Sequence, residues 1–534
     1  MKNKVIKGSV TSLVSDAYNK FLVSILAERL CESGSVLKDL LTSQFNITPD
    51  NARKVISRAS NSKLIKSSDP FTFGKGQFIY LLADKDLDVE KVKSICKDNR
   101  PPIFRLLKAL DENNGIISYY EALKITASPL EPSTTKVSNL DDITNLLRKL
   151  DIIYIRTVDE VKYLLYLKEG NQHTDDHESA LITDHRSKMY IDSSMLPDIL
   201  RWLAKCNMIT TTQSPYRNRN SPSIGAKLNN LVWDATSFTR ATGINPIVGS
   251  KADSKEKQTL VVLDVVLSSE YLEAYLDGFY NRIQIVLNST KQGTRKVMPV
   301  IIYSECSEAV QGRIRKLGFI SYDIGSIFGT KIYQVLKTLK KVKNVQLMEN
   351  VDKTVENLLS IIKDSGQEDS LRTLKGLLFE ALLFPLLKTL YPNSIIEPNK
   401  KLTVDGKTRE FDYIIKASNP VEIVLIELKG YSASAAIPVG DHETKDTLGY
   451  FFRGSVPLAQ KYFKKNSLFD YNIRAAFLTS GTFWKDGREF LKHIGSGKLQ
   501  SSVLGVSYDR EDLITLLKKY EFKRAARIID DFFC

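Results

Sequence analysis

The stretch TREFDYIIKASNPVEIVLIELKG, residues 408–430, constrains the fold of this 534-residue chain more than any other. Its second half is a nearly continuous apolar run that ends in Glu427, Leu428 and Lys429. Such a run is typical of a strand buried in the centre of a sheet. Side chains two residues apart on a strand share a face, about 6.5–7 Å apart, so Glu427 and Lys429 should project together. If the preceding strand pairs with this one, Asp412 comes beside Glu427.

Two carboxylates and one ammonium would then converge at the end of a central strand. Carboxylates that leave coordination positions open can hold Mg²⁺ or Mn²⁺ against a phosphate. The ammonium of Lys429 can stabilise charge or act on the attacking water. The alternative interpretation is a cross-strand ion pair at a solvated sheet edge.

The order of these residues resembles the PD-(D/E)xK, or restriction-endonuclease-like, nuclease superfamily over residues about 375–510. The family's proline is absent, since Phe411 precedes Asp412. The resemblance implies an αβββαβ core and a glutamate on the helix before the sheet, a position that Glu380 fills in LKGLLFEALLF. Glu380 can instead be a surface residue of an amphipathic helix. Pro385, one turn later, should kink or break that helix.

The resemblance also implies how the site would work. The metal ligands would be Asp412, Glu427, Glu380 and the backbone carbonyl of Leu428. Lys429 would position or deprotonate the water that attacks the scissile phosphate. The expected activity is that of a Mg²⁺-dependent phosphodiesterase, a deoxyribonuclease.

The charge of the chain favours a polyanionic partner, because 76 Lys and Arg stand against 62 Asp and Glu, a net charge of +14. Residues 1–84 are predicted to form three helices and a hairpin, the layout of a winged helix, whose third helix commonly enters the major groove. The expected DNA contacts are Arg53, Lys54 and Arg58 on the third helix and Lys75 at the hairpin tip. A winged helix that contacts protein is the alternative.

Residues 85–170 repeat this layout. The third helix of this second module begins with Asp141 and Asp142, which would repel phosphate, so a spacer or partner-binding role is expected. Residues 171–189 are predicted to be a polar linker. Its three histidines, His173, His177 and His185, lie among aspartates, and a solvated linker is favoured over a metal site.

Residues 190–345 are predicted to form an α/β domain that echoes the C-terminal one. Near its start, Arg217 and Arg219 lie in a basic, turn-rich run that can contact phosphates or form a loop. VVLDVVL parallels IVLIELK, and LVWDATSF parallels REFDYIIK. Asp234 and Asp264 thereby take the places of the C-terminal Asp and Glu, whereas Val266 stands where the lysine does. This predicts a nuclease-like copy without activity; the alternative is an unrelated Rossmann-type layer.

Residues 346–534 are predicted to form the nuclease domain itself. A long loop over 431–447 follows the ExK strand, and loops of this length beside a site often bind substrate. His442 in this loop is expected to be a plain surface residue. A basic helix over 450–465 carries Arg453 and Gln460, which are predicted to contact nucleic acid.

The sequence as a whole thus predicts a multidomain chain of α+β and α/β units. The expected function is a metal-dependent DNA endonuclease, by analogy in defence or mobile-element biology. The alternative is a non-catalytic DNA-binding or scaffold subunit of a larger nucleoprotein complex. The expected partners are DNA and either a second copy of the chain or another protein of a complex.

The cellular setting is predicted from what the sequence lacks. Its five cysteines are scattered and form no CxxC pair, which suits a reducing cytoplasm. No signal peptide is recognised, and no apolar run approaches the roughly 18 residues that a membrane span needs.

Overall fold

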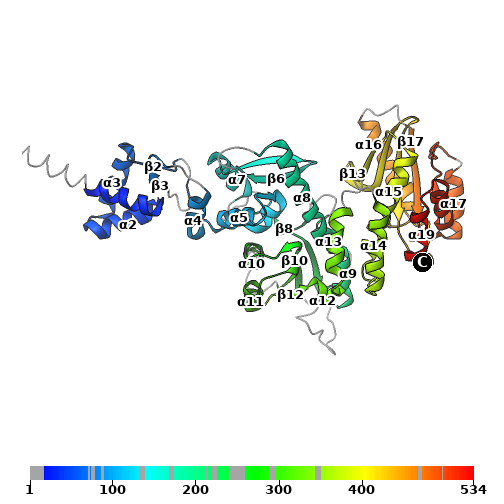
Figure 1. Ribbon diagram of the computed structural model, residues 1–534, viewed down its shortest axis with the longest axis horizontal. Helices are drawn as coiled ribbons and strands as arrows, with labels where there is room; N and C mark the ends of the chain where they lie inside the picture. Colours follow the sequence, from blue (N-terminus) through cyan, green and yellow to red (C-terminus); the bar gives the residue numbers. More distant parts are fainter. Residues whose placement is uncertain are drawn as a thin grey trace, which may run out of the picture.

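The computed structural model has a mixed α and β fold with several small sheets. In Figure 1 the blue N-terminal helices and the red C-terminal ones lie at opposite ends of the long axis, and the green segments lie beside the cyan ones between them. The described residues are 17–69, 72–73, 78–85, 89–131, 139–167, 173–210, 214–218, 225–239, 259–288, 296–342, 350–466, 472–495 and 497–534. Within these ranges no helix is long and apolar enough to cross a bilayer.

The first unit consists of three helices and a small sheet of order β1-β3-β2. Its elements are a helix over 17–29, β1 (Glu32–Ser33), α2 (Gly34–Phe45), α3 (Pro49–Asn61), β2 (Ile65–Ser67) and β3 (Ile79–Leu82). Thr48 caps α3 by accepting the N–H of Asn51, and Pro49 occupies the first turn, where a missing N–H costs nothing. The apolar face of α3 is buried, so its basic residues face solvent.

The second unit repeats this connectivity, with a sheet of order β4-β6-β5. Its elements are α4 (Val89–Asn99), α5 (Pro101–Glu112), β4 (Ile116–Ser118), α6 (Tyr119–Thr126), α7 (Leu140–Lys149), β5 (Ile153–Val158) and β6 (Val161–Tyr166). A reciprocal capping box between Ser118 and Glu121 fixes the start of α6.

Helix α8 (Asp175–Ser194) occupies most of the segment predicted to be a polar linker, so that prediction is wrong there. The helix buries polar side chains together with apolar ones such as Ile182 and Met189. His185 lies 2.7 Å from Glu121 of α6, and Glu178 accepts the hydroxyl of Tyr154 at 2.9 Å. These two contacts pair buried polar side chains of α8 with residues of other elements, which stabilises the helix without the hydrophobic periodicity that would have identified it.

The third unit contains a four-stranded sheet of order β12-β11-β10-β9. Strand β9 is antiparallel to β10, whereas β10, β11 and β12 run parallel. Its elements are α9 (Leu196–Lys205), β7 (Ala226–Leu228), β8 (Leu231–Trp233), β9 (Ala235–Thr239), β10 (Thr259–Glu270), α10 (Glu273–Asn288), β11 (Val297–Glu305), α11 (Glu308–Lys316), β12 (Ile320–Asp323), α12 (Ile324–Phe328) and α13 (Ile332–Val342).

The C-terminal unit contains a five-stranded sheet of order β13-β14-β15-β17-β19. Its helices are α14 (Val351–Asp364), α15 (Arg372–Leu390), the π-helix η2 (Tyr450–Ser455), α16 (Val456–Lys465), α17 (Lys485–Gly495), α18 (Arg510–Lys519) and α19 (Lys523–Phe532). Its strands are β13 (Ile395–Val404), β14 (Lys407–Ser418), β15 (Val421–Lys429), β16 (Ala436–Ile437), β17 (Asn472–Thr479), β18 (Thr482–Phe483) and β19 (Ser507–Tyr508). Helix α15 continues through Pro385 without a break.

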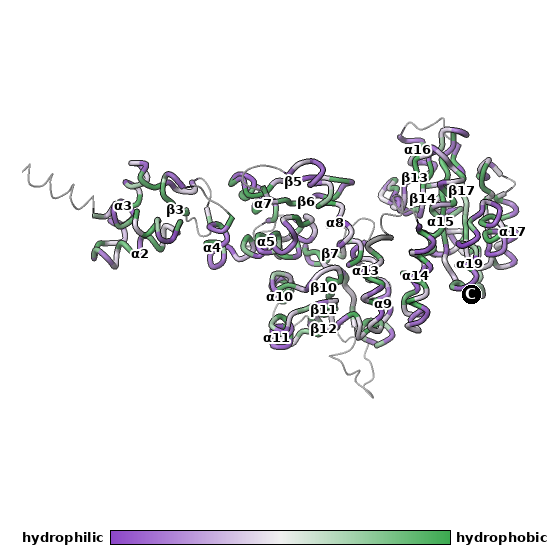
Figure 2. Tube along the Cα trace, in the orientation of Figure 1, coloured by the Kyte–Doolittle hydropathy of each residue, from purple (hydrophilic) through white to green (hydrophobic). Residues whose placement is uncertain are grey.

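The two larger sheets have the same connectivity. In each, an antiparallel strand (β9 or β14) pairs with a central strand (β10 or β15), which is followed by two parallel strands. The internal echo in the sequence therefore corresponds to a repeated arrangement of strands. Both units contribute to one continuous hydrophobic core, so the predicted boundary at 345/346 does not separate two cores. Strands β10, β11 and β17 lie in predominantly green, hydrophobic parts of the trace in Figure 2.

Candidate active site

The three residues of the D…ExK pattern meet at the end of β15. Tyr413 pairs with Ile426, and the same register places Asp412 opposite Glu427. The N–H of Leu428 donates to Oδ2 of Asp412 at 2.6 Å. Oε1 of Glu427 lies 2.9 Å from Nζ of Lys429, so the two side chains share a face. The predicted convergence of these side chains is confirmed.

These residues line a cavity of about 760 Å³. Glu380 reaches the same cavity from α15, as the family resemblance implied, and Lys445, Asp446 and Tyr450 reach it from the long loop and η2. Tyr216 and Asn218 contribute to it from the preceding unit. The cavity is therefore formed by two parts of the chain that are about 200 residues apart.

Helix α15, which carries Glu380, is capped by a residue of another helix. Asp198 of α9 accepts the backbone N–H groups of Thr373 and Leu374, each at 3.1 Å. The residue at the helix's own N-cap position, Leu371, makes no side-chain capping bond. A carboxylate at a helix N-terminus satisfies otherwise unpaired N–H groups and opposes the helix dipole. Asp198 thus fixes the position of α15 relative to the third unit.

Two close contacts hold α15 against β14 and the end of β15. A Cβ atom on Gly430, directly after the ExK sequence, would lie 2.6 Å from Cβ of Phe379, so only glycine permits this approach. The hydroxyl of Tyr413 donates to the backbone carbonyl of Glu380 at 3.1 Å. These contacts bring Glu380 to the end of β15.

Glu427, which lies beside Asp412, has a pKa that burial and mutual repulsion raise above its usual range. Burial raises the pKa of Glu427 to about 8; Lys429 opposes this shift and Asp412 adds to it. Burial alone would lower the pKa of Lys429, but the carboxylates of Glu427, Asp412 and Asp446 outweigh it and raise that pKa. Nζ of Lys429 lies 3.1 Å from Oδ1 of Asp446. Lys429 is therefore an ammonium. Its single positive charge does not balance the acidic side chains of Asp412, Glu427 and Asp446 around it.

The donor set fits a hard divalent cation. Asp412 and Glu427 present oxygen ligands in an open cavity, and the raised pKa of Glu427 indicates a carboxylate that a cation would stabilise. Among the described residues, no three His, Cys, Asp or Glu side chains lie close enough to form a metal site by themselves. The resemblance supplies two further candidates, Glu380 and the carbonyl of Leu428, and their roles stay predictions.

The third unit contains a matching pair of carboxylates. Leu263 pairs with Ala235, and the same register places Asp264 opposite Asp234. The N–H of Val265 donates to Oδ2 of Asp234 at 2.8 Å, which repeats the bond between the equivalent residues of the C-terminal unit. The predicted equivalence of the Asp234–Asp264 pair with the Asp412–Glu427 pair therefore extends to the strand register and to one hydrogen bond.

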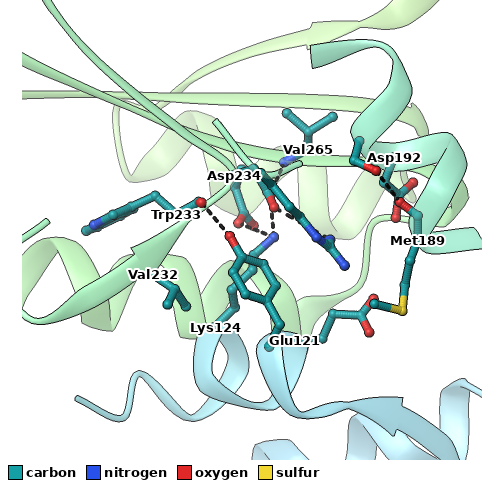
Figure 3. Close-up of polar contacts among 12 residues, drawn as sticks. Glu121, Lys124, Met189, Asp192, Val232, Trp233, Asp234 and Val265 are labelled. Carbon is teal, nitrogen blue, oxygen red and sulfur yellow. Dashed lines mark hydrogen bonds and ion pairs between the residues drawn. The ribbon is translucent and has the colours of Figure 1, made fainter. Parts of the chain in front are cut away.

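This second pair is neutralised by cations of the protein itself, and Figure 3 shows one of them, the Lys124 ammonium, directed at the Asp234 carboxylate. Lys124 of α6 forms ion pairs with Asp234 and, at 2.9 Å, with Asp264. Arg282 lies 2.8 Å from Asp264, and Arg217 lies 3.7 Å from Asp234. Burial would raise the pKa of Asp264, but Lys124 and Arg282 hold it at about 2. We refer to these five residues as the buried cluster.

The buried cluster has no room for substrate, since the cavity beside it measures about 20 Å³. Val266 stands at the position that corresponds to Lys429 and is buried in the apolar core. The ammonium comes instead from Lys124, which lies 110 residues before Asp234 in the sequence. No spacing rule in the sequence identifies that partner.

The predicted nucleic-acid contacts have different outcomes. Arg217 is 1% exposed within the buried cluster, so the prediction that it contacts phosphate is wrong. Arg53, Lys54 and Arg58 are exposed on α3. Lys75 and Arg219 lie outside the described residues.

Two predicted contacts of the C-terminal unit are exposed but lie elsewhere. Neither Arg453 nor Gln460 is among the described residues that line the cavity. The guanidinium of Arg453 lies over the ring of Phe490, 4.8 Å from its centroid. His442 is exposed, as predicted.

Sequence reasoning missed Asp446, Tyr450 and Tyr216 as lining residues. The long loop after the ExK strand was a usable signal for Asp446, but its contact with Lys429 depends on how the loop folds. Comparisons with protein-family models, curated proteins and solved structures found no match for this chain.

Proposed function

We propose that this protein is a metal-dependent nuclease that hydrolyses phosphodiester bonds in DNA at the C-terminal cavity. The observation that carries the proposal is the contrast between two equivalent carboxylate pairs. In the C-terminal pair, Glu427 has a pKa of about 8 and faces a cavity of about 760 Å³. In the buried cluster, Asp264 has a pKa of about 2, and the cavity that Lys124 and Arg217 line measures only about 20 Å³. The first pair faces one cation, Lys429, and has room for a phosphate, whereas the second pair is surrounded by Lys124, Arg217 and Arg282.

Asp412 and Glu427 would hold Mg²⁺ or Mn²⁺, with Glu380 and the carbonyl of Leu428 as further ligands that the family resemblance suggests. The bound cation would polarise the scissile phosphate and neutralise charge that develops on it. The order of elements, with α15 followed by β13, β14 and β15, then α16 and β17, corresponds to the αβββαβ pattern of the PD-(D/E)xK superfamily. This order supports the proposal independently of the three residues.

Lys429 carries its proton at neutral pH, because three carboxylates raise its pKa. An ammonium cannot accept a proton from water, so we assign Lys429 to orienting the attacking water and stabilising negative charge on the phosphate. Its contact with Asp446 holds the ammonium at the cavity wall. The sequence left two roles open for Lys429, positioning the attacking water and deprotonating it, and this assignment keeps the first.

DNA affinity would come from regions outside the cavity. The chain has a net charge of +14, and the exposed basic side chains of α3 belong to a unit with the helix and strand order of a winged helix. A cytoplasmic location fits the cysteines, all five of which are described and none of which forms a disulfide. By analogy, such an enzyme would serve defence or a mobile element.

The test is incubation of the purified protein with supercoiled DNA, linear DNA and RNA in Mg²⁺, Mn²⁺ or chelator. The variants are Lys429→Ala and, as a matched control, Lys416→Ala on the neighbouring strand, where Lys416 pairs with Glu397. We expect metal-dependent DNA breaks from the wild type and from the control. Lys429→Ala should still retain DNA in a mobility-shift assay but should not cut it.

Two results would contradict the proposal. Unchanged cleavage by Lys429→Ala would exclude this centre as the active site. DNA retention that is insensitive to metal, without strand breaks in either Mg²⁺ or Mn²⁺, would favour the rival function of a non-catalytic DNA-binding or scaffold subunit.

A further inference from the structure

Residues 214–218 connect the buried cluster with the C-terminal cavity. The segment runs beside β9: the N–H of Thr236 donates to the carbonyl of Pro215 at 3.0 Å, and the N–H of Arg217 donates to the carbonyl of Asp234 at 2.6 Å. Tyr216 forms an antiparallel bridge with Ala235. These bonds fix the segment as an extra strand at the edge of the sheet.

Side chains of an extended segment alternate between two sides. Arg217 turns into the buried cluster, where its guanidinium pairs with Asp234 and lies 4.5 Å from the centroid of the Tyr120 ring. Tyr216 and Asn218, the residues on either side of it, line the C-terminal cavity. The carboxylates of the buried cluster thus anchor a segment that forms one wall of the C-terminal cavity.

Tyr216 has the exposure of a binding residue. The residue is 40% exposed, and among the described residues only six large hydrophobic ones are exposed to this degree or more. An aromatic ring on the wall of a cavity that also holds carboxylates and Lys429 can stack on a nucleic-acid base. A cavity of about 760 Å³ is in the size range of pockets that bind small ligands, which suits one base taken out of a duplex or carried by a single strand.

We propose that Tyr216 is the base-stacking residue of the C-terminal cavity, that it takes a base of a single-stranded or locally opened strand, and that Arg217 holds it in position from the buried cluster. This rests on the proposed nuclease function for its substrate class. It assigns the buried cluster a purpose: the carboxylates that no longer hold metal position a substrate contact of the neighbouring site. Tyr216 touches substrate, whereas Arg217 is a positioning residue.

The geometry of the buried cluster supports a rigid anchor. Arg282 of α10 and Lys124 of α6 both form ion pairs with Asp264. Helix α10 approaches α6 so closely that a Cβ on Gly278 would lie 2.7 Å from the carbonyl oxygen of Lys124. Packing of this kind leaves Asp234 little freedom, so the guanidinium of Arg217 has a fixed partner.

The experiment measures binding of a single-stranded DNA oligonucleotide that contains 2-aminopurine, in Mg²⁺, to full-length protein carrying Lys429→Ala to prevent cleavage. Tyr216→Ala should weaken binding roughly 5- to 150-fold and abolish the stacking-induced quenching of 2-aminopurine. Tyr216→Phe should behave as the parent, because the ring is retained. Tyr280→Ala is the matched control, since Tyr280 is 36% exposed but does not line the cavity.

Arg217→Met separates positioning from direct contact. If Arg217 acts only by holding Tyr216, its loss should weaken binding and quenching but leave the slope of log K against log salt unchanged. A phosphate contact would reduce that slope by about one. A thermal melt of each variant confirms that the compared proteins are folded, and Tyr216→Ala tests the stacking even if Arg217→Met does not fold.

Each outcome has one meaning. Binding by Tyr216→Ala equal to that of Tyr280→Ala overturns the proposal, even if the wild type cleaves DNA. A wild type that never cleaves, combined with loss of quenching in Tyr216→Ala, overturns the nuclease function and leaves the stacking residue in place. Failure of the parent to bind any oligonucleotide overturns both.

Discussion

Replacing Lys124 with methionine should destabilise the protein strongly although Lys124 lies outside the active site. The side chain is 7% exposed, and its ammonium pairs with two carboxylates that are each 1% exposed. Methionine keeps most of the volume and removes the charge. Breaking a buried ion pair from one side costs about 3–5 kcal/mol, because the remaining charge has no solvent.

The lowered pKa of Asp264 gives a second, independent magnitude for the free energy that its ion pairs contribute to folding. Its lowering from 3.8 to about 2 means that Asp264 stabilises the folded state above about pH 4, by about 2 kcal/mol, and that this contribution is lost as the pH falls through 2. In the Lys124→Met variant the Asp264 carboxyl can instead take up a proton. Protonating it costs about 4 kcal/mol at pH 7 and roughly 1.5 kcal/mol at pH 5. The deficit of the variant should therefore shrink between pH 7 and pH 5.

The assay is urea unfolding followed by the fluorescence of Trp233, which is fully buried and has Arg282 over its ring at 4.8 Å. Trp202 and Trp484 are replaced by phenylalanine so that the signal reports on the third unit. Lys108→Met is the control, since Lys108 pairs with Glu273 at 3.1 Å in a partly exposed position, where an ion pair contributes about 1 kcal/mol or less. Equal losses for the two variants at pH 7 would refute this reasoning.

Three further outcomes follow from the contacts described above. Asp198→Ala should lower the stability of the C-terminal unit by about 1–2 kcal/mol in urea unfolding and reduce cleavage, because it removes the cap of α15; a variant with unchanged stability would contradict the capping role. Glu380→Gln should raise the Mg²⁺ concentration for half-maximal cleavage, whereas Glu397→Gln on β13 should not; equal requirements would remove Glu380 from the metal site. Replacing Arg53, Lys54 and Arg58 with alanine should weaken DNA binding and reduce its salt slope, by up to about three if each contacts a phosphate; an unchanged slope would assign α3 to a protein partner.

The central features of the C-terminal site could be predicted because they depend on local sequence. The apolar run before Glu427 identified a central strand, and a period of two then placed Lys429 on the same face. The Asp-Gly dipeptide at 405–406 is a strong signal for a hairpin turn, and β13 and β14 pair around it in a register that leads to Asp412. The equivalence of Asp234 and Asp264 followed from the same pattern, and the structure extends it to strand order.

The errors concern charged residues whose partners are distant in the sequence. Arg217 looked like a phosphate contact because its neighbours are polar, yet its partner is the carboxylate of Asp234 across a strand edge. Helix α8 looked like a linker because its buried positions include Glu178 and His185, which only the contacts with other helices and strands make stable. Lys124 cannot be connected with Asp264 from sequence, since no local pattern encodes a contact between separate units.

The most direct test compares cleavage by Glu427→Gln and Asp264→Asn, which change equivalent positions of the two carboxylate pairs. Each variant is assayed with DNA in Mg²⁺, and the rate is divided by the fraction of folded protein. We predict that Glu427→Gln loses metal-dependent strand breakage at every DNA concentration, whereas Asp264→Asn, which acts only on substrate positioning, cleaves at the wild-type rate per folded molecule when DNA is saturating. Cleavage retained by Glu427→Gln, or lost in fully folded Asp264→Asn, would contradict the assignment of one catalytic and one anchoring site.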